Sequence, residues 1–555
     1  MIQINLISNT KTTPINVKIG SRVIDLLPEE DKTKYCVCKI GHSIKELRYQ
    51  FSSKDAGKNV CFLGLENIQG GKAYESTLRY VIAMAFFNLY PDVNIQFSYN
   101  ISRSIFCKLL NNDLHMSSFI NNIMEEVKRI IKNNYPIERV TVTIEEAKEI
   151  YAKYNHLDKL EMLTYRPDNT VHLYKCDNYY DYMHGYMLPS TGCIKNYKIK
   201  PYSPGLIIQY PRYELDASIP EFIDEGTYAK TIMHARKWSE SIHARTICEI
   251  NNKIINNQND FIQLCEAKHY HMLTELGQTI SDQKETIRLI TIAGPSSSGK
   301  TTFCNRLRIE LLSRGLQPVM ISMDDYYLTR EEIMKIQNVS REEVDLEHVN
   351  CLDIELFNQN IYDLINGNEV TLPKFNFKTG KREQGRTLKV GPNSPIIIEG
   401  IHALNDKLTS SIPKYQNFKI YIAPQMQINI DDHTPVSTTD IRLIRRIVRD
   451  MKYRNSSPQE TISMWQSVRE GEFKWIYPFQ EGANYVYNSE LTYELAVMAN
   501  VALPALKQIT PEEPEYLVAN RLIKLLKYFT PITDHSVIPS NSLLREFIGG
   551  SCFKV

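Results

Sequence analysis

A glycine- and serine-rich loop between an apolar run and an amphipathic helix restricts the fold of this chain more than any other segment. Ile287–Ile292 is a short apolar run typical of a buried parallel strand. The loop that follows reads GPSSSGKT, and Phe303, Leu307 and Leu311 then recur at four-residue steps on one helix face. This order of strand, loop and helix predicts an open α/β sheet with a phosphate-binding loop at its edge.

The loop has the chemistry that a triphosphate needs. Glycines let backbone N–H groups approach the phosphate oxygens, and the helix N-terminus adds partial positive charge. The Lys300 ammonium can bridge the outer phosphates, and the Thr301 hydroxyl can hold Mg²⁺. We therefore predict a site for ATP and Mg²⁺ that is formed by Gly294, Pro295, Ser296, Ser297, Ser298, Gly299, Lys300, Thr301 and Thr302.

Two further apolar runs end in carboxylates. Pro318–Met323 is followed by Asp324 and Asp325, and Pro395–Ile398 by Glu399. Because the carboxyl ends of parallel strands face the ligand, we expect these groups near the loop. Asp324 is predicted to act as the general base for an attacking hydroxyl, and both Asp324 and Glu399 to help hold Mg²⁺. Asp325 is expected to point away and to cap a turn.

The segment DIRLIRRIVRDMKYR carries four arginines on one predicted helix face. Arg442, Arg445, Arg446 and Arg449 stand at i, i+3, i+4 and i+7. Such a run is often a solvated surface, but a kinase needs cations around the transferring phosphoryl group. We therefore predict a lid helix that closes over the site, with Arg442 and Arg445 catalytic and Arg446 in contact with substrate.

Six stretches together resemble the uridine kinases and phosphoribulokinases. In chain order they are GPSSSGKTTF, SMDDYY, LEHVNCLD, LPKFNF, IIIEGIHALN and DIRLIRRIVRD, within residues 287–489. The resemblance implies that Asp324 is the base, that Arg442 and Arg445 lie at the phosphates, and that Glu347 binds the ribose hydroxyls. It also implies that Tyr327, Phe375 and Phe377 flank a nucleobase.

The acceptor is less well defined. Asn376 and Gly380 stand where uridine kinases carry an aspartate and a histidine that contacts the pyrimidine. The function we expect is ATP-dependent phosphoryl transfer to a small metabolite, a nucleoside first and a sugar or sugar phosphate second. An ATPase that senses tRNA or an amino acid is the alternative from another class.

The front of the chain contains two modules. Residues 1–62 alternate short β-like runs with turn residues, which predicts a small mixed α/β module. Through VKIGSRVIDLL and KNVCFLGLENIQGG it resembles the TGS domain of threonyl-tRNA synthetases. Residues 63–215 predict an α+β domain, with helices over Thr77–Leu89, Met116–Asn133 and Ile144–Tyr154.

This second module resembles the editing domain of threonyl- and alanyl-tRNA synthetases through LRYVIAMAFFNLYPDV and MLPSTGCIKNYKI. The positions of that family's zinc ligands fall on Ser76, Tyr80, Met183 and Met187, which cannot form a zinc site. We therefore expect no zinc-dependent deacylase activity, and a structural or ligand-holding role instead.

The remaining segments complete the predicted architecture. Residues 216–280 read as a helical linker, 281–490 as a kinase domain with a doubly wound parallel sheet, and 491–555 as a helical extension containing Leu517–Tyr528.

Composition excludes some classes of function. With 65 basic and 64 acidic residues the net charge is +1, which disfavours a dedicated nucleic-acid binder, although a basic face within residues 1–210 would still allow tRNA. We see no signal peptide and no apolar run of ~20 residues that could cross a bilayer. The cysteines are scattered, and Cys36 and Cys38 are expected to be buried thiols, so we expect a cytoplasmic protein. The partner is expected to be a small-molecule substrate, and a homo-oligomer is left open.

Overall fold

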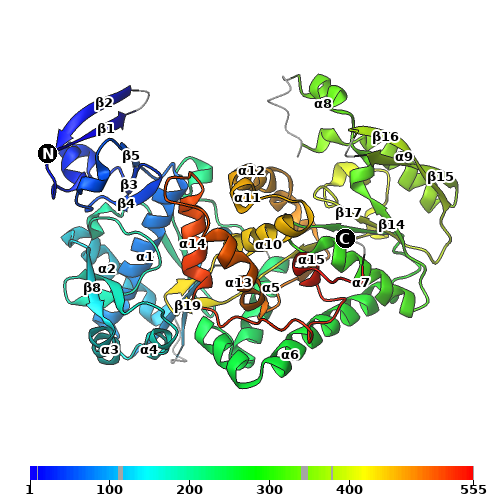
Figure 1. Cartoon of the computed structure of the whole chain (residues 1–555). Helices are drawn as coiled ribbons and strands as arrows, with labels where there is room; N and C mark the ends of the chain where they lie inside the picture. Colours follow the sequence, from blue (N-terminus) through cyan, green and yellow to red (C-terminus); the bar gives the residue numbers. More distant parts are fainter. Residues whose placement is uncertain are drawn as a thin grey trace.

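The computed structural model describes residues 1–8, 11–99, 101–110, 117–224, 226–338, 348–376 and 379–553, with only the backbone for residues 117 and 118 (Figure 1). Among these residues no helix has both the length and the apolar character needed to span a bilayer.

The N-terminal module is a five-stranded mixed sheet. Its strand order is β2-β1-β5-β3-β4, and only β1 and β5 pair in parallel. Ile4, Cys38 and Val60 lie in its core, because alternate side chains of a strand point to the same face. Cys36 and Cys38 are buried and form no disulfide, as predicted. The strands are β1 (Ile2–Ser8), β2 (Lys11–Val17), β3 (Val37–Ile40), β4 (Ser43–Glu46) and β5 (Asn59–Leu63).

The second module is built around α1 (Ile68–Leu89). This helix is apolar on most sides and is buried along most of its length. The helix begins at Ile68, nine residues before the predicted start at Thr77, and Gly70 lies within it. A side chain at Gly70 would collide with the Gly64 carbonyl, so the glycine here permits close packing and does not mark a helix end.

Two antiparallel sheets and three helices complete this module, with strand orders β11-β12-β7-β6 and β10-β9-β8. The strands are β6 (Ile95–Tyr99), β7 (Ile105–Leu109), β8 (Glu138–Thr143), β9 (Thr170–Cys176), β10 (Tyr179–Asp181), β11 (Lys198–Tyr202) and β12 (Gly205–Gln209). The helices are α2 (Ser117–Asn133), α3 (Ile144–Lys153) and α4 (Leu157–Thr164), so two predicted helices are confirmed to within a residue at each end.

The segment predicted as a linker is helical, and its longer helix belongs to the core of the predicted kinase half, residues 216–553, while the shorter helix packs Ala229 and Ile232 against the front half. α5 (Gly226–Ser241) is followed by α6 (Ile247–Ser281), which is kinked at Asn257. Apolar residues of α6, among them Phe261 and Ile280, share one buried cluster with the helix that follows the phosphate loop. Figure 1 shows α6 running along the lower edge of the kinase half.

The kinase half contains a five-stranded, fully parallel sheet with strand order β14-β17-β13-β18-β21. Its alternate residues belong to two different buried clusters, with Ile290 and Ile292 in one and Leu289 and Ala293 in the other. Both faces are therefore covered, which confirms the predicted parallel-sheet fold. The strands are β13 (Leu289–Ala293), β14 (Val319–Ser322), β17 (Ile396–Glu399), β18 (Asn417–Ala423) and β21 (Tyr485–Asn488).

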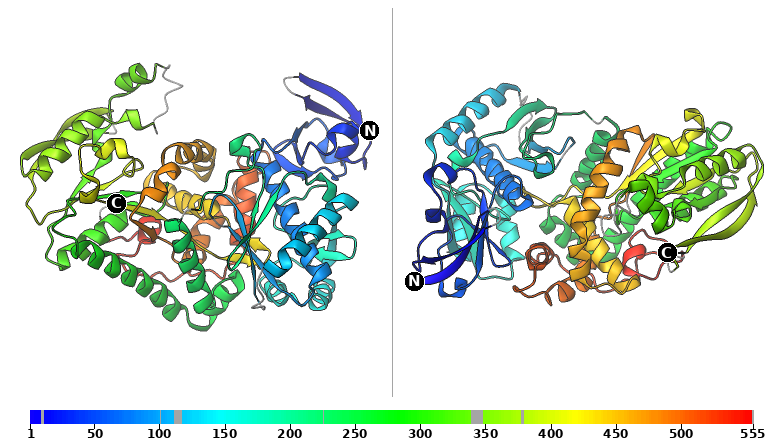
Figure 2. Two further views of the ribbon diagram at one scale, coloured as in Figure 1. Left: turned by 180° about the vertical axis from the view of Figure 1, so that it is seen from behind. Right: turned by 90° about the horizontal axis from the view of Figure 1, so that it is seen from above.

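This half also contains further helices and two hairpins, which Figure 2 shows from two more sides. The helices are α7 (Lys300–Ser313), α8 (Arg330–Gln337), α9 (Ile354–Ile365), α10 (Thr438–Tyr453), α11 (Pro458–Ser463), α12 (Trp465–Trp475), α13 (Glu494–Leu506), α14 (Tyr516–Leu526) and α15 (Arg545–Ile548). The hairpins are β15 (Glu369–Asn376) with β16 (Lys381–Lys389) and β19 (Asn429–Asp431) with β20 (Thr434–Pro435).

The β19–β20 hairpin joins the two halves of the protein. The Phe97 N–H donates to the Asp432 carbonyl at 2.8 Å, and the Asn429 amide donates to the Phe97 carbonyl at 2.7 Å. The front half of the chain, residues 1–215, is therefore hydrogen-bonded directly to the kinase half.

Candidate active site

Three neighbouring strands of the parallel sheet end at the same edge. Glu399, the last residue of β17, is in register with Ile292 of β13 on one side and with Ser322 of β14 on the other. Gly294 follows Ile292 by two residues, and Asp324 follows Ser322 by two. The topology thus brings the start of the phosphate loop, Asp324 and Glu399 to one edge of the sheet.

The two glycines of the phosphate loop, Gly294–Thr301, have different tasks. Gly299 caps α7 with a φ of +89°, a backbone conformation that favours glycine. Gly294 instead permits close packing, since a Cβ there would lie 2.0 Å from the Ile422 carbonyl oxygen of β18. We expected both glycines to let phosphate approach the backbone. The contacts at Gly294 indicate a packing role for this glycine instead.

The loop offers polar groups to an anion. The Ser297, Ser298 and Thr302 hydroxyls are buried without a hydrogen-bond partner. A buried, unsatisfied polar group costs roughly 1–3 kcal/mol, so these hydroxyls suit a ligand that bonds to them. The Lys300 ammonium donates to the Gly294 carbonyl at 2.8 Å and to the Pro295 carbonyl at 3.2 Å.

The charged groups of the site influence one another. Burial raises the pKa of Glu399 to about 7, with Lys300 opposing the shift and Asp324 adding to it. Burial also raises the pKa of Asp324, again opposed by Lys300. The pKa of Lys300 is lowered by burial and partly restored by Glu399. One electrostatic environment therefore contains the ammonium and both carboxylates.

Aromatic side chains lie close to Asp325. The Asp325 carboxylate accepts the Phe375 backbone N–H at 3.3 Å, which ties β15 to the end of β14. The Phe375 and Tyr327 rings are 5.9 Å apart between centroids and inclined at 52°. Two of the three predicted nucleobase contacts are thus neighbours, while Phe377 and Glu347 lie outside the described residues.

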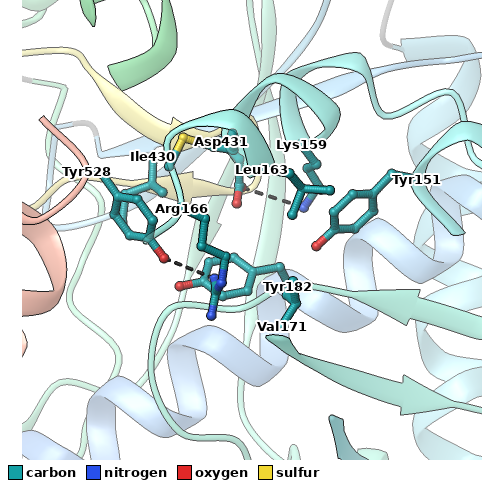
Figure 3. Close-up of a pocket in the computed structure, with 10 residues that line it drawn as sticks. Tyr151, Lys159, Leu163, Arg166, Val171, Tyr182, Ile430, Asp431 and Tyr528 are labelled. Carbon is teal, nitrogen blue, oxygen red and sulfur yellow. Dashed lines mark hydrogen bonds and ion pairs between the residues drawn. The ribbon is translucent and has the colours of Figure 1, made fainter. Parts of the chain in front are cut away.

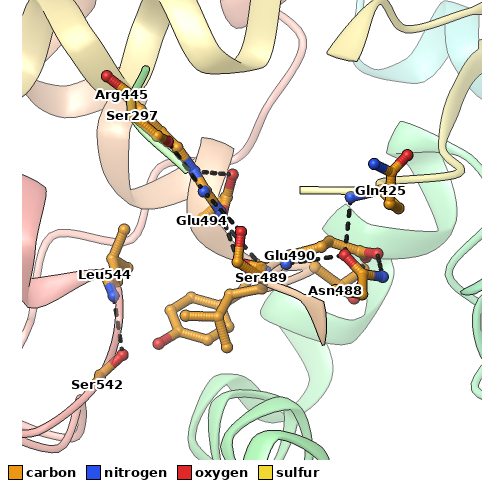
Figure 4. A network of polar contacts seen from close by, with 12 residues as sticks. Ser297, Gln425, Arg445, Asn488, Ser489, Glu490, Glu494, Ser542 and Leu544 are labelled. Atoms are coloured by element: carbon orange, nitrogen blue, oxygen red, sulfur yellow. Dashed lines mark hydrogen bonds and ion pairs between the residues drawn. The ribbon is translucent and has the colours of Figure 1, made fainter. Parts of the chain in front are cut away.

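The arginines of α10 do not form an exposed lid. Arg442 and Arg445 are only 3% and 1% exposed, and the apolar residues between them are part of the core. Arg442 Nε donates to the Ser296 carbonyl at 3.1 Å, and its guanidinium pairs with Glu472. Arg445 donates to the Ser297 carbonyl at 3.3 Å and pairs with Glu494 at 2.5 Å (Figure 4).

These contacts give Arg442 and Arg445 a supporting position, because both bind the backbone of the phosphate loop. Arg446 lies nearer the surface, where it donates to the Ser296 hydroxyl at 2.9 Å. We predicted that this helix closes over the site as a lid. Its burial contradicts that prediction, because a segment that opens to solvent has few buried apolar contacts.

Sequence reasoning missed two carboxylates at the loop and one arginine that interacts with Asp324. The Glu546 carboxylate accepts the Thr302 N–H at 3.1 Å, and the Glu472 carboxylate accepts the Ser296 N–H at 3.1 Å. Arg454, at the end of α10, has its pKa lowered mainly by burial, while Asp324 opposes that shift, so these two groups also interact. No local pattern identifies Glu546 and Glu472 as loop contacts, because both are far from the loop in the chain, whereas Arg454 ends the arginine-rich segment DIRLIRRIVRDMKYR.

A cavity between the two halves is a second place where a ligand could be sought (Figure 3). It is lined by Lys159, Arg166, Asp431 and Tyr528, among others, but its volume is about 20 Å³. That volume holds about one water molecule. The Lys159 ammonium beside it pairs with Asp181 within the front half and lies 3.6 Å from Asp431 of β19, so the contact with Asp431 joins the halves.

The four residues that the predicted resemblance to an editing domain aligns with zinc ligands are all buried, namely Ser76, Tyr80, Met183 and Met187. Within the described ranges, no group of three or more His, Cys, Asp or Glu side chains is arranged to hold a metal ion.

Comparisons with known proteins concern the kinase half. The model of the "Phosphoribulokinase / Uridine kinase family" matches residues 289–490. A uridine kinase of Ureaplasma parvum serovar 3 is 30% identical over 197 residues, which cover 35% of this chain and 85% of that protein. A uridine kinase of Staphylococcus haemolyticus is 30% identical over 180 residues, covering 32% of this chain and 76% of that protein.

The solved "Structure of a Possible Uridine Kinase from Bacillus stearothermophilus" is 20% identical, with a TM-score of 0.26, and covers 39% of this chain and 97% of that one. The resemblance of residues 1–215 to synthetase modules stays a prediction. Through residues 289–490, the chain belongs to the phosphoribulokinase/uridine kinase family.

Proposed function

We propose that this protein transfers a phosphoryl group from ATP to a hydroxyl of a small metabolite, with Mg²⁺, and that the acceptor is a nucleoside. The observation that carries the proposal is the meeting of Lys300, Asp324 and Glu399 at one sheet edge, beside the Tyr327–Phe375 pair. An open α/β sheet binds its ligand at such an edge.

The residues fit the two cofactors. The unpaired hydroxyls of Ser297, Ser298 and Thr302 suit phosphate oxygens, and Thr301 and Glu399 are oxygen donors of the kind that Mg²⁺ prefers. Bound MgATP would supply the phosphoryl group and neutralise part of its charge. Lys300 would leave the loop carbonyls and bind the outer phosphates.

Asp324 would accept the proton of the attacking hydroxyl. Its raised pKa makes it a better base than an ordinary aspartate, and the nearby Lys300 keeps it ionised. Tyr327 and Phe375 would orient the acceptor by stacking on its base. Arg442 and Arg445 would keep the loop in shape through its carbonyls.

A sugar or sugar phosphate is the second candidate acceptor, and the hairpin gives a specific reason to consider it. Asn376 donates to Glu383 at 2.7 Å, and Gly380 has a φ of +66°. With Gly380 in place of a histidine, this chain lacks the side chain that contacts the pyrimidine in uridine kinases.

A substrate panel separates the two candidates. Purified protein is incubated with MgATP and uridine, cytidine, adenosine or a set of sugar phosphates, and ADP release is measured. Lys300→Ala serves as the control for contaminating kinases. Turnover of a nucleoside supports the proposal, whereas turnover only with non-nucleoside acceptors would defeat the nucleoside assignment.

A further inference from the structure

The C-terminal segment Ser542–Ile548 lies against the phosphate loop. A Cβ built on Gly299 would be 3.2 Å from Leu543 Cδ2, and the Glu546 carboxylate accepts the Thr302 N–H at 3.1 Å. The N–H groups in the first turn of a helix have no partner within that helix, so they bind anions. Glu546 therefore supplies an anion at the helix end where a phosphate is expected. Figure 1 shows α15 beside α7.

This segment is firmly held. The Ser542 hydroxyl donates to Glu266 at 2.6 Å, and Arg545 donates to the His535 and Ile538 carbonyls at 2.7 Å each. Leu543 and Phe547 are buried, and Glu546 is 5% exposed. The carboxylate is thus presented to the loop by an ordered part of the fold.

Glu546 also affects the charges of the site. Its carboxylate opposes the lowering of the Lys300 pKa and adds to the raised pKa of Glu399. The three hydroxyls of the same loop have no partner, so the carboxylate fills only part of the anion site.

We propose that Glu546 is an internal competitor of the phosphate donor, occupying the Thr302 N–H until a nucleoside di- or triphosphate displaces it. The inference rests on the proposed function, because it requires that the loop binds nucleotide. One N–H cannot serve a carboxylate and a phosphate equally well, and the two negative charges would repel each other at this distance.

The expected size of the effect follows from that single contact. A charge-assisted hydrogen bond changes an equilibrium constant by about ten- to hundredfold. The apparent dissociation constant equals the intrinsic one divided by the fraction of open protein. Glu546→Ala should therefore bind MgATP and MgADP at least about tenfold more tightly than the natural protein.

The test measures both dissociation constants by calorimetry on the full-length chain. Glu546→Ala is compared with Glu546→Gln, which keeps the size of the side chain and guards against a failure to fold. Glu512→Gln, which changes an exposed carboxylate of the same C-terminal region, is the control. We expect at least about tenfold tighter binding and a lower KM for ATP in Glu546→Ala. Glu546→Gln should show a smaller gain, because its amide oxygen can still accept the Thr302 N–H but carries no charge, and the control should not change.

Unchanged or weaker nucleotide binding in both Glu546 variants would overturn the inference while leaving the kinase proposal intact. Tighter binding without turnover of any acceptor would support the inference and remove the proposed function. If no nucleotide bound to any of the proteins, both would fall.

Discussion

Replacing Arg445 distinguishes support of the loop from direct action on phosphate. Its guanidinium binds Glu494 through Nε at 2.9 Å and through Nη2 at 2.5 Å, and it also donates to the Ser489 carbonyl at 2.8 Å. Arg445 and Glu494 are 1% and 0% exposed. Arg445→Met keeps most of the side-chain length but leaves the Glu494 carboxylate buried without its cation.

The loss of unfolding free energy in Arg445→Met should be large. Removing one partner of a buried ion pair costs about 3–5 kcal/mol, because the remaining charge is uncompensated. In the double variant Arg445→Met/Glu494→Gln no charge is left, and the glutamine oxygen can still accept the Leu491 N–H that Glu494 accepts at 3.2 Å. We expect the free energy of unfolding of the double variant to be only about 1–2 kcal/mol below that of the natural protein. This remaining loss corresponds to the hydrogen bonds from Arg445 to the loop, which the double variant also lacks.

Urea unfolding of the natural protein, the single variant and the double variant measures these free energies. Lys452→Met replaces an exposed cation on the same helix and should change stability by less than about 0.5 kcal/mol. If Arg445→Met unfolded like the natural protein but lost about a thousandfold in turnover, Arg445 would act on the phosphate itself, and the supporting role would be wrong.

Three further predictions concern the polar edge of the sheet. Lys300→Ala should nearly abolish turnover and weaken nucleotide binding, as measured by initial rates and calorimetry, whereas an unaltered rate would remove the loop from the mechanism. Asp324→Asn should bind ATP normally but lose about 10²-fold or more in rate, while Asp325→Asn should stay near normal, because its side-chain oxygen still accepts the Phe375 N–H. Glu399 has a pKa of about 7 in the folded protein against an ordinary 4.5, so between these values the folded state binds more protons than the unfolded state. In metal-free buffer this group should lower stability as pH rises from about 4.5 to 7, and Glu399→Gln should remove that slope in urea titrations. An identical slope in the variant would contradict the assignment.

The local features of the site could be predicted from the sequence. The apolar strand, the loop and the helix follow one another within about thirty residues, and parallel strands end at a common edge whatever lies around them. For that reason the meeting of Lys300, Asp324 and Glu399 could be predicted, as could the parallel sheet itself. Tyr327 follows the short turn after β14, and Phe375 lies near the end of β15 in a separate hairpin, so their proximity depends on the Asp325–Phe375 hydrogen bond that ties the two segments together.

Other assignments depended on which side of a segment is buried. The regular spacing of Arg442, Arg445 and Arg446 suggested an open cationic face, but carboxylates from α12 and α13 bury the first two. The segment 216–280 read as a linker because its helices look amphipathic, yet α6 completes the core behind α7. Periodicity predicts that a segment is helical, but it does not predict which part of the protein packs against that helix.

The sequence by itself determined the kinase sheet, its phosphate loop and the acidic strand ends, because each depends on residues close together in the chain. Only the tertiary structure decided that Arg442 and Arg445 hold the loop, that the front half is bonded to the β19–β20 hairpin, and that Glu546 stands at Thr302. Each of these contacts joins residues more than a hundred positions apart in the chain. Their partners are chosen by how the folded surfaces fit, and no local pattern carries that information.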